Sequence, residues 1–299
     1  MWNPEQTSRP LGRRPTPRPH RDEPTAIRRG ESAHHVWGDR IAGFVTDRVI
    51  SSTQQLHVLE YELPPSGEFR HSELNQTVFG ADVLYMVLSG SLLLANPETG
   101  EVVRSDAGEG RLFHRGTWHN GFNPSTTETV RVLEFFSPPP ARGTASDFSR
   151  TQPPLDSVLY RDTRWRGRWP EARALQAAST SFADVSPRNA LLSFRDDDPG
   201  HLIATLVDTE FLRVDHGTVR SGHVEDFLDA EAESVLYVTE GELWVDVWAA
   251  GVGYQATSVL LPGDAMFLPS GCAERLLVRD SRSATYLRGF GSVPDGWVL

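Results

Sequence analysis

The stretch GEGRLFHRGTWHNGFN, residues 108–123, decides the fold predicted for this chain. Its glycines Gly108 and Gly116 suit tight turns that need a positive φ, and they bracket a short apolar run that predicts a strand. His119 then opens a second predicted strand, on which His119 and Asn123 share one face because side chains alternate along a strand. A histidine on a strand is by itself more often a core or surface residue than a ligand. The spacing of Gly108, Gly116, His119 and Asn123 is more informative than the histidine alone.

This spacing resembles the second motif of the cupin family, in which Gly, Pro, Gly, His and Asn recur at fixed intervals. Gly108, Gly116, His119 and Asn123 stand at matching positions, and His114 stands where the family has proline. The resemblance implies a small all-β barrel whose interior can hold a metal ion.

Residues 71–90 resemble a modified first cupin motif, which has the form His-x-His, a short loop, Glu, and a strand ending in Gly. His71 is present, Glu73 stands where the second His would be, and the strand ends at Gly90. Val83 stands where the family has its glutamate. The resemblance therefore implies a metal site with an unusual set of ligands.

The same landmarks recur about 150 residues further along the chain. The matched pairs are His71 and His223, Gly90 and Gly241, Gly108 and Gly263, and Gly116 and Gly271, separated by 152, 151, 155 and 155 residues. Four landmarks in nearly one register indicate a duplication. The chain thus resembles a bicupin, a protein of two cupin barrels, over about two-thirds of its sequence.

Short β-rich runs alternate with clusters of Gly, Pro, Asn and Asp, which is typical of all-β barrels. We expect two tandem cupin-like barrels of the jelly-roll (double-stranded β-helix) type, over 36–140 and 191–299. Residues 141–190 are the predicted connector, and 169–180 has the pattern of a short helix. Residues 1–35 are rich in Pro and Arg and predict a disordered or extended arm.

Composition narrows the functional classes. A chain of 299 residues can bury two cores, and no apolar run is long enough to span a membrane. The N-terminus carries no apolar signal segment, and the single cysteine, Cys272, excludes an intramolecular disulfide. We therefore expect a cytoplasmic protein that does not act at a membrane.

The chain contains no lysine, because all 29 of its basic residues are arginines. This excludes Schiff-base chemistry, attachment of pyridoxal phosphate and a P-loop. Residues 1–40 carry eight Arg against five acidic residues, so the rest of the chain carries −11 − 3 = −14. Such an acidic body disfavours nucleic acid as a partner. The arginines of the arm could contact that body or a second subunit, so a homodimer is an open alternative to a solvated tail.

In the first barrel, the resemblance implies that His71, Glu73 and His119 bind one divalent transition metal. Two imidazoles and one carboxylate with open positions suit Fe(II), with Mn, Ni or Zn as alternatives. A metal-free barrel, in which both histidines hydrogen-bond Glu73, is the competing interpretation. Tyr85 shares the inward face of its strand and could donate a proton, or it could be a plain core aromatic. His114 is a candidate catalytic group at the rim.

The second barrel offers His223, Glu225 and Glu274, and Glu274 stands at the position of His119. Mn or Fe could use one imidazole and two carboxylates. An acidic pair that faces the surface is the alternative.

We therefore expect a metal-dependent bicupin enzyme that acts on a small organic substrate. The first expectation is an Fe(II)-type dioxygenase of an aromatic or enol-containing compound, because ring-cleaving dioxygenases are among the bicupins that this chain resembles. A non-redox isomerase or cyclase is the nearest alternative, with Tyr85 or His114 moving a proton. A non-catalytic small-molecule-binding bicupin is the third, since the fold alone does not imply catalysis.

Overall fold

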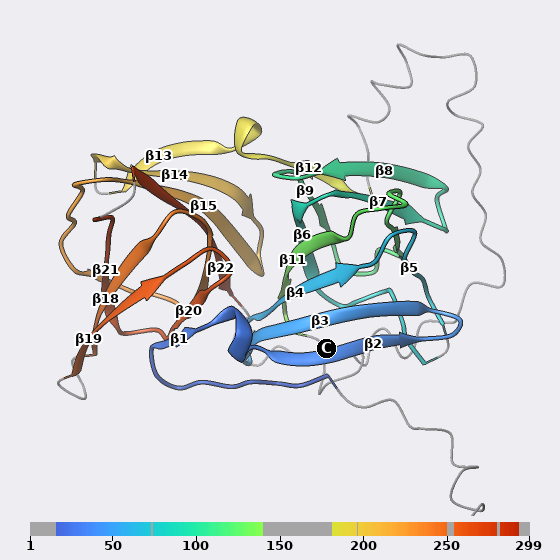
Figure 1. Cartoon of the computed structure of the whole chain (residues 1–299), viewed down its shortest axis with the longest axis horizontal. Coiled ribbons are helices and arrows are strands. Elements are labelled where there is room, and N and C mark those ends of the chain that lie inside the picture. The colour runs from blue at the N-terminus through green and yellow to red at the C-terminus, as the bar shows by residue number, and fades with distance from the viewer. Residues whose placement is uncertain are drawn as a thin grey trace, which may run out of the picture.

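The computed structural model describes residues 16–72, 74–139, 181–195, 197–249, 254–279 and 282–292. These residues form 22 strands and two short 3₁₀ helices. The strands build two sandwiches side by side (Figure 1), each with one seven-stranded and one four-stranded sheet. The predicted all-β fold of two barrels is confirmed, whereas the predicted connector helix lies outside the described residues. No helix among the described residues has the length and apolar character needed to cross a membrane.

The first barrel is built mainly from β2 to β11. These strands are β2 (Ala33–Asp39), β3 (Gly43–Ser52), β4 (His57–Leu63), β5 (Glu68–Phe69), β6 (Asp82–Ser89), β7 (Ser91–Asn96), β8 (Glu101–Asp106), β9 (Gly110–Phe113), β10 (Asn120–Phe122) and β11 (Val130–Ser137). The larger sheet has the order β9-β6-β11-β4-β3-β2, and the smaller has β5-β10-β7-β8. All neighbouring strands in both sheets are antiparallel.

The second barrel repeats this arrangement. Its strands are β13 (Leu191–Arg195), β14 (Asp198–Asp208), β15 (Leu212–Arg220), β16 (Leu228–Asp229), β17 (Ser234–Glu240), β18 (Leu243–Ala249), β19 (Tyr254–Leu260), β20 (Ala265–Leu268), β21 (Ala273–Leu277) and β22 (Ser283–Gly291). The larger sheet has the order β20-β17-β22-β15-β14-β13, and the smaller has β16-β21-β18-β19. Each strand corresponds to one in the first barrel, as the repeated landmarks predict.

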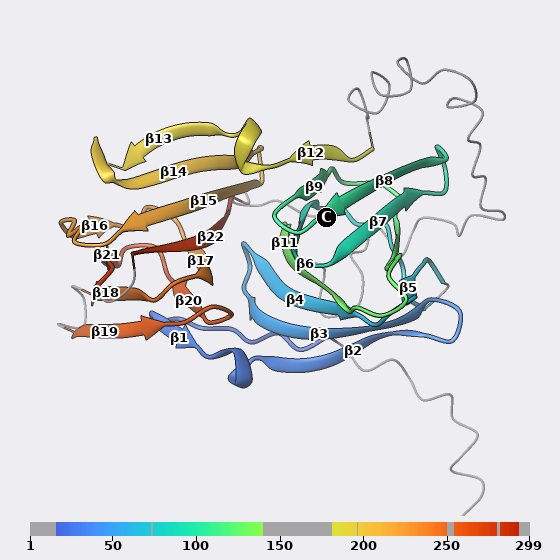
Figure 2. The same cartoon turned by 45° about the horizontal axis from the view of Figure 1, so that its top comes forward.

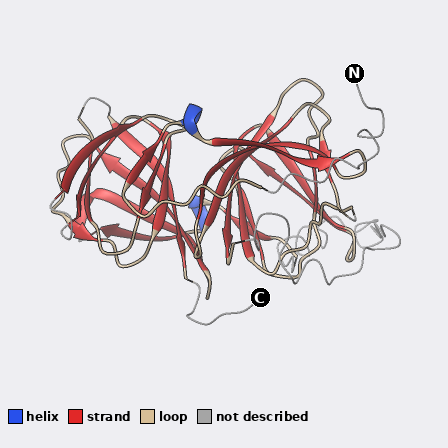
Figure 3. Ribbon diagram, turned by 90° about the horizontal axis from the view of Figure 1, so that it is seen from below, coloured by secondary structure: helices blue, strands red, loops and turns tan. Residues whose placement is uncertain are grey.

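The barrels also exchange one strand each. The exchanged strands are β1 (Thr25–Ile27), which pairs with β20, and β12 (Ala183–Val185), which pairs with β9. Figure 2 shows β12 beside β9. Each strand is followed by a 3₁₀ turn, η2 (Arg29–Glu31) or η4 (Pro187–Asn189), and both turns lie near the junction of the barrels (Figure 3). Part of the predicted arm is therefore a strand of the second barrel. The domain boundaries at 36 and 191 stay predictions.

Strand β6 shows how the sequence builds both the barrel and the junction. Its alternate side chains Val83 and Tyr85 belong to the core of the first barrel. The intervening Leu84 and Met86 belong to a second apolar cluster, which also contains Phe267 of the second barrel. An apolar run without polar interruption is expected for a strand that is buried on both faces. The outward faces of the two larger sheets therefore pack against each other.

The junction buries the charged side chain of Glu60. The carboxylate of Glu60, on β4, accepts hydrogen bonds from Arg29 at 2.9 Å, from Arg131 at 2.9 Å and from the hydroxyl of Tyr237 at 2.8 Å. Burial alone would raise the pKa of Glu60, but these three hydrogen bonds lower it to about 2. Because Tyr237 comes from the second barrel and Arg29 from η2, the hydrogen bonds of Glu60 connect the first barrel, the second barrel and η2.

Candidate functional site

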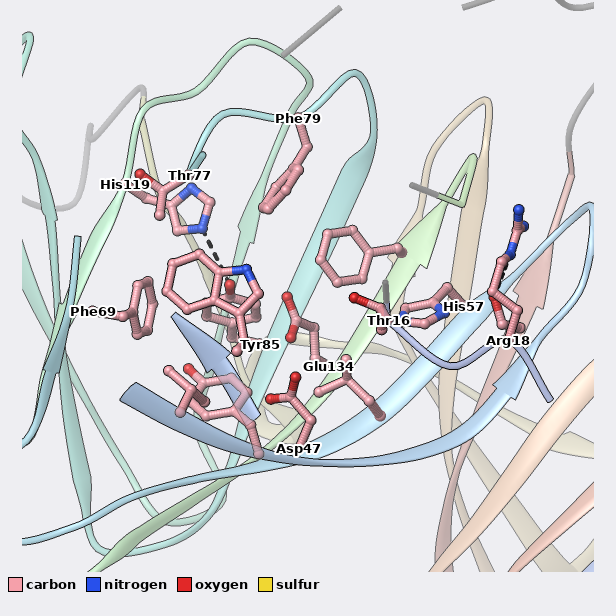
Figure 4. A pocket seen from close by; sticks show the side chains of 16 residues that line it. Thr16, Arg18, Asp47, His57, Phe69, Thr77, Phe79, Tyr85, His119 and Glu134 are labelled. Carbon is pink, nitrogen blue, oxygen red and sulfur yellow. Dashed lines mark hydrogen bonds between the residues drawn. The ribbon is translucent and has the colours of Figure 1, made fainter. Parts of the chain in front are cut away.

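A pocket of about 80 Å³ lies inside the first barrel (Figure 4). Its apolar wall is mostly aromatic and includes Trp37, Phe69, Phe79 and Phe136. Besides Arg18, its polar wall contains six titratable groups, Asp47, His57, Tyr61, Tyr85, His119 and Glu134. All six are buried. Such a concentration of buried acids and bases in an apolar pocket marks a candidate active site.

The strand register explains why these groups converge. Glu134 on β11 lies directly opposite Tyr85 on β6, and Asp47 on β3 lies directly opposite Tyr61 on β4. Opposite residues on paired strands point to the same face of the sheet. The side chains of this pocket wall therefore come from the inward face of the larger sheet.

His119 immediately precedes β10 and is buried. Its Nδ1 lies 3.4 Å from the carbonyl oxygen of Thr117, and its Nε2 lies 3.1 Å from the hydroxyl of Tyr85. Because a carbonyl can only accept, Nδ1 carries the proton, and the Tyr85 hydroxyl donates to Nε2. Burial lowers the pKa of His119 to about 3, so the ring is neutral at pH 7.

Glu134 lies beside Tyr85 in the same wall, at the directly opposite position on β11. Burial raises the pKa of its carboxyl well above the usual range, and the nearby Asp47 raises it further, against an opposing effect of Tyr85. These effects favour the protonated carboxyl. Tyr85 thus donates to His119 and has the carboxyl of Glu134 as its neighbour across the sheet.

Asp47 has a different environment from its neighbour Glu134. Its Oδ2 lies 3.0 Å from Nδ1 of His35, on the adjacent strand β2. Two carboxyl groups in one pocket thus have different partners, which is how a site separates an acid from a base. No sequence motif points to Asp47, His35 or Glu134, because their proximity arises only from pairing between strands.

Three buried polar atoms that line the pocket have no hydrogen-bond partner within the described residues. They are Nδ1 of His57 and the hydroxyl oxygens of Tyr61 and Thr77. A buried polar atom without a partner costs about 1–3 kcal/mol. Burial also lowers the pKa of His57 to about 3, which keeps its ring neutral. A bound polar ligand would satisfy these atoms, so their position favours a binding function.

The predicted metal ligands of the first barrel are only partly described. His71 lies in the loop after β5 rather than on a strand; its Nδ1 accepts a hydrogen bond from the Thr77 N–H at 3.1 Å, and its ring packs on Trp118 at 4.5 Å. Glu73 lies outside the described residues. In the described part of the first barrel, His119 and His71 join no group of three His, Cys, Asp or Glu residues that could hold a metal. The set of His71, Glu73 and His119 stays a prediction.

The two predicted catalytic residues differ in position. Tyr85 lies in the pocket wall, as its inward face predicts. His114 lies at the rim, where its side chain is 63% exposed and its Nδ1 lies 3.0 Å from Oδ1 of Asp82. It is not among the residues that line the pocket. The catalytic role of His114 stays a prediction without support from its contacts.

In the second barrel, two of the three predicted metal ligands lie together and the third, Glu274, does not join them. Nε2 of His223 lies 3.4 Å from Oε2 of Glu225, so these two residues come together. Glu274 is engaged elsewhere, in buried ion pairs with Arg195 and Arg288. His201 of β14 takes the third place, with Nδ1 2.9 Å from Oε2 of Glu225. His201 lies outside both motifs, so no motif position selects it.

No family model matches the sequence, and no curated protein matches it. Solved structures do match. A glyoxylate-induced protein from Pseudomonas aeruginosa is 15% identical, with a TM-score of 0.65 over 97% of each chain. Oxalate decarboxylase of Lactobacillus farciminis, in complex with formate, is 11% identical, with a TM-score of 0.57 over 94% of this chain and 88% of that one.

A vicilin from hazelnut, Corylus avellana, is 14% identical, with a TM-score of 0.58 over 89% of this chain and 85% of that one. Similarity at this level of identity concerns the fold. A decarboxylase and a vicilin share the arrangement, so the function has to be argued from the site.

Proposed function

Since the chain has the bicupin fold, we propose that it is an enzyme which moves protons on a small organic molecule in the first barrel, as a non-redox isomerase or cyclase does. One observation carries the proposal. The hydroxyl of Tyr85 donates to His119, and Glu134 lies directly opposite Tyr85 on the neighbouring strand, in the wall of a largely aromatic pocket. Neutral donors and acceptors that lie together can give a proton at one point and be refilled at another.

Tyr85 and Asp47 divide the acid and base roles. Tyr85 is the general acid, because burial raises the pKa of its hydroxyl well above the usual range and keeps it protonated. Asp47 is the general base, with its carboxylate oriented by His35. Glu134 and His119 position the Tyr85 hydroxyl, and Glu134 can replace its proton.

The proposed step balances without an oxidant. Asp47 takes a proton from a carbon beside a carbonyl group of the substrate. The electron pair of that C–H bond moves toward the carbonyl, and the carbonyl oxygen takes the hydroxyl proton of Tyr85. Asp47 then returns its proton to a different carbon of the conjugated system, while Tyr85 recovers its own. Substrate and product have the same formula.

The pocket also suggests the class of substrate. Its aromatic wall fits a flat apolar body. Arg18 and His57 lie at the end of the pocket away from His119 (Figure 4). The guanidinium of Arg18 donates to Ser52 Oγ at 3.2 Å and to the Thr53 carbonyl at 3.1 Å, which fixes its position. A fixed cation at one end favours an unsaturated carbonyl compound that bears a carboxylate.

An Fe(II)-type dioxygenase at His71, Glu73 and His119 is the competing proposal. Burial lowers the pKa of both His71 and His119, which suits metal ligands because they must be neutral. Against it, His119 uses both ring nitrogens for contacts within the protein. The described residues thus do not complete a metal site in this barrel, and no step above passes through a metal.

Deuterium exchange tests the proposal. A panel of cyclic unsaturated keto acids would be incubated with the protein in D₂O under air, with NMR following the C–H signals and an electrode following dissolved oxygen. We expect exchange or isomerisation of at least one compound without oxygen uptake, and a large loss of rate in Tyr85→Phe. Oxygen uptake that needs added Fe(II) and vanishes in His119→Ala would favour the dioxygenase. Saturable binding without exchange would favour a non-catalytic binding protein.

A further inference from the structure

We infer a second and independent site, in which His201, His223 and Glu225 of the second barrel bind a divalent transition metal. The site lies apart from the proposed reaction, which uses residues of the first barrel alone. Its ligand set also differs from the one implied by the cupin motifs, because His201 lies on β14 and Glu274 is not included.

The distances between the three groups match those between ligands of one ion. Oε2 of Glu225 lies 2.9 Å from Nδ1 of His201 and 3.4 Å from Nε2 of His223. One ligand atom from each residue lies within 4.8 Å of the others. With metal–ligand bonds of about 2.0–2.2 Å, neighbouring ligand atoms are roughly 3.0–3.5 Å apart in tetrahedral or octahedral sites. Only small shifts would therefore be needed to accept an ion.

Each of the three groups makes a further polar contact with another part of the protein. Nε2 of His201 lies 2.7 Å from the hydroxyl of Tyr286, and Nδ1 of His223 lies 3.3 Å from Oδ2 of Asp198. The second oxygen of Glu225 accepts a hydrogen bond from a backbone N–H at 2.8 Å. Metal-binding histidines and carboxylates commonly have such outer partners, which fix the ring tautomer and aim the ligand atom. The same pattern on all three residues favours a built site over a chance cluster.

The surrounding charges leave room for a cation. The carboxylate of Glu274 contacts the guanidinium groups of both Arg195 and Arg288, whereas that of Asp198 lies against His223. Arg195 lies nearer to Glu274, at 3.0 Å, than to Glu225, at 3.8 Å. Both arginines therefore pair mainly with Glu274. Glu225 is the carboxylate left for a metal.

The described residues of the first barrel form no counterpart to this site. His201 lies opposite Val219 on β15, and Ala284, the neighbour of Val219 on β22, packs against Gly241. From Gly90 the same chain of pairings runs through Val130 and Leu63. Continued one residue past the Thr46–Glu62 pair, it reaches Val45 on β3, an apolar core residue. Of the two matched positions, only the one in the second barrel holds a histidine, beside the His223 and Glu225 that the motif supplies.

The donor set selects the class of metal. Two imidazoles and one carboxylate suit Zn(II), Co(II) and Fe(II), and they are poor partners for Ca(II) or Mg(II), which prefer oxygen. All three ligands are at least nine-tenths buried, and a surface recess beside His223 gives access. An ion bound here joins β14 to the loop after β15. We therefore assign it a stabilising role in the second barrel.

Co(II) is the probe of choice, because its visible absorption reports nitrogen and oxygen ligation without any activity assay. The full chain, without a histidine tag, would be stripped with chelator, dialysed and titrated with CoCl₂. We expect one Co(II) per chain with visible d–d bands, and a higher melting temperature of the loaded protein. His201→Asn and Glu225→Gln should weaken binding about 10- to 100-fold or more. Glu274→Gln is the matched control and should keep the bands.

Other results would overturn the site. One is a wild-type protein that binds no Co(II); another is His201→Asn with unchanged bands and affinity. Loss of the bands in Glu274→Gln, with retention in His201→Asn, would move the site to the position implied by the motif. Circular dichroism of each variant before titration separates lost ligation from lost folding. Because Glu225→Gln preserves the size of the side chain, it tests ligation even if His201→Asn is unstable.

Discussion

The two barrels share one strand order and differ at three matched positions in their interiors. Counted from the turns at Gly90 and Gly241, Tyr85 corresponds to Leu236. Their strand partners are Glu134 and Arg288, and the residues three after the turns at Gly116 and Gly271 are His119 and Glu274. In the first barrel, Tyr85 donates to His119 and lies opposite the carboxyl of Glu134, beside a pocket. In the second, the matched positions hold the ion pair of Arg288 with Glu274.

This difference shows how one scaffold separates two kinds of interior. The two partners of a buried ion pair stay paired, because removing either of them leaves a charge that the interior cannot solvate. A row of neutral groups can exchange protons with a bound molecule at little electrostatic cost. The strands therefore fix where side chains meet, and the residue types at those positions decide whether the barrel interior can react.

Replacing Tyr85 by Phe should have the largest effect on this contrast. The change removes the hydroxyl that donates to His119, and the ring still fills its place in the core. Turnover or proton exchange should fall roughly 10²–10⁴-fold, the usual contribution of a general acid. Rates of proton exchange, measured on protein with a native circular dichroism spectrum, test this.

Tyr237→Phe is the matched control. Tyr237 stands in a second Val-Leu-Tyr sequence, but its hydroxyl donates to Glu60 in the junction. The rate per folded molecule should be unchanged in this variant, while its stability falls. An equal loss of rate in both variants would mean that Tyr85 acts through the fold and not through its proton.

Ile27→Ala should give the next largest effect, on the strand exchange. Ile27 of β1 is 2% exposed and packs in the apolar cluster between the barrels. Loss of a buried isoleucine side chain costs roughly 2–5 kcal/mol. Val185→Ala, in the other exchanged strand, should cost less because it removes fewer atoms. Chemical denaturation of both variants checks the order, and an unchanged midpoint in Ile27→Ala would mean that β1 contributes nothing.

The sequence predicted the fold because glycine spacing survives duplication. Turns at Gly108 and Gly116, and again at Gly263 and Gly271, have positive φ, as expected. The Val-Leu-Tyr repeat, by contrast, is misleading. Tyr85 and Tyr237 are 152 residues apart, while the turns at Gly90 and Gly241 are 151 apart. A shift of one residue moves a side chain to the other face of a strand, which puts one tyrosine in the pocket and the other in the junction.

The rest of the site could not be predicted for a related reason. His35 with Asp47, and His201 with Glu225, are partners brought together by sheet pairing or a loop, with no fixed spacing in the sequence. A motif selects residues by their position in the sequence. It therefore selects Glu274, although the carboxylate of this residue forms ion pairs with arginines. The arm was similarly predicted from composition, whereas β1 is ordered by pairing with a strand some 240 residues away.

Glu60→Gln should have a smaller effect than Ile27→Ala, and it probes what couples the barrels. The variant loses the charge that holds Arg29, Arg131 and Tyr237 together. We expect a loss of about 1–3 kcal/mol, below the usual cost of breaking a buried pair, because both arginines are partly exposed. Urea denaturation at pH 7 measures it.

The same variant has a pH signature. The pKa of Glu60 is about 2 in the folded protein, below its ordinary value of 4.5. Its ionised form therefore stabilises the protein above pH 4.5, and this contribution is lost as the pH falls from 4.5 towards 2. The difference in unfolding free energy between wild type and Glu60→Gln should shrink over that interval. A constant difference would show that the charge is not the source of the effect.

Arg18→Gln should give the smallest effect, and it sharpens the contrast between the interiors. In the second barrel Arg195 and Arg288 pair with Glu274, whereas in the first barrel Arg18 lies at the end of a pocket lined largely by aromatic rings. If the substrate carries a carboxylate, glutamine would keep the polar contacts and lose the charge. KM should then rise about tenfold with kcat nearly unchanged, since the interaction is the same in the bound substrate and in the transition state. Methyl esters of the same compounds supply the control, because they should not distinguish wild type from Arg18→Gln. A fall in kcat at constant KM would place Arg18 in the chemistry itself, and equal kinetics would show that the substrate is neutral at that end.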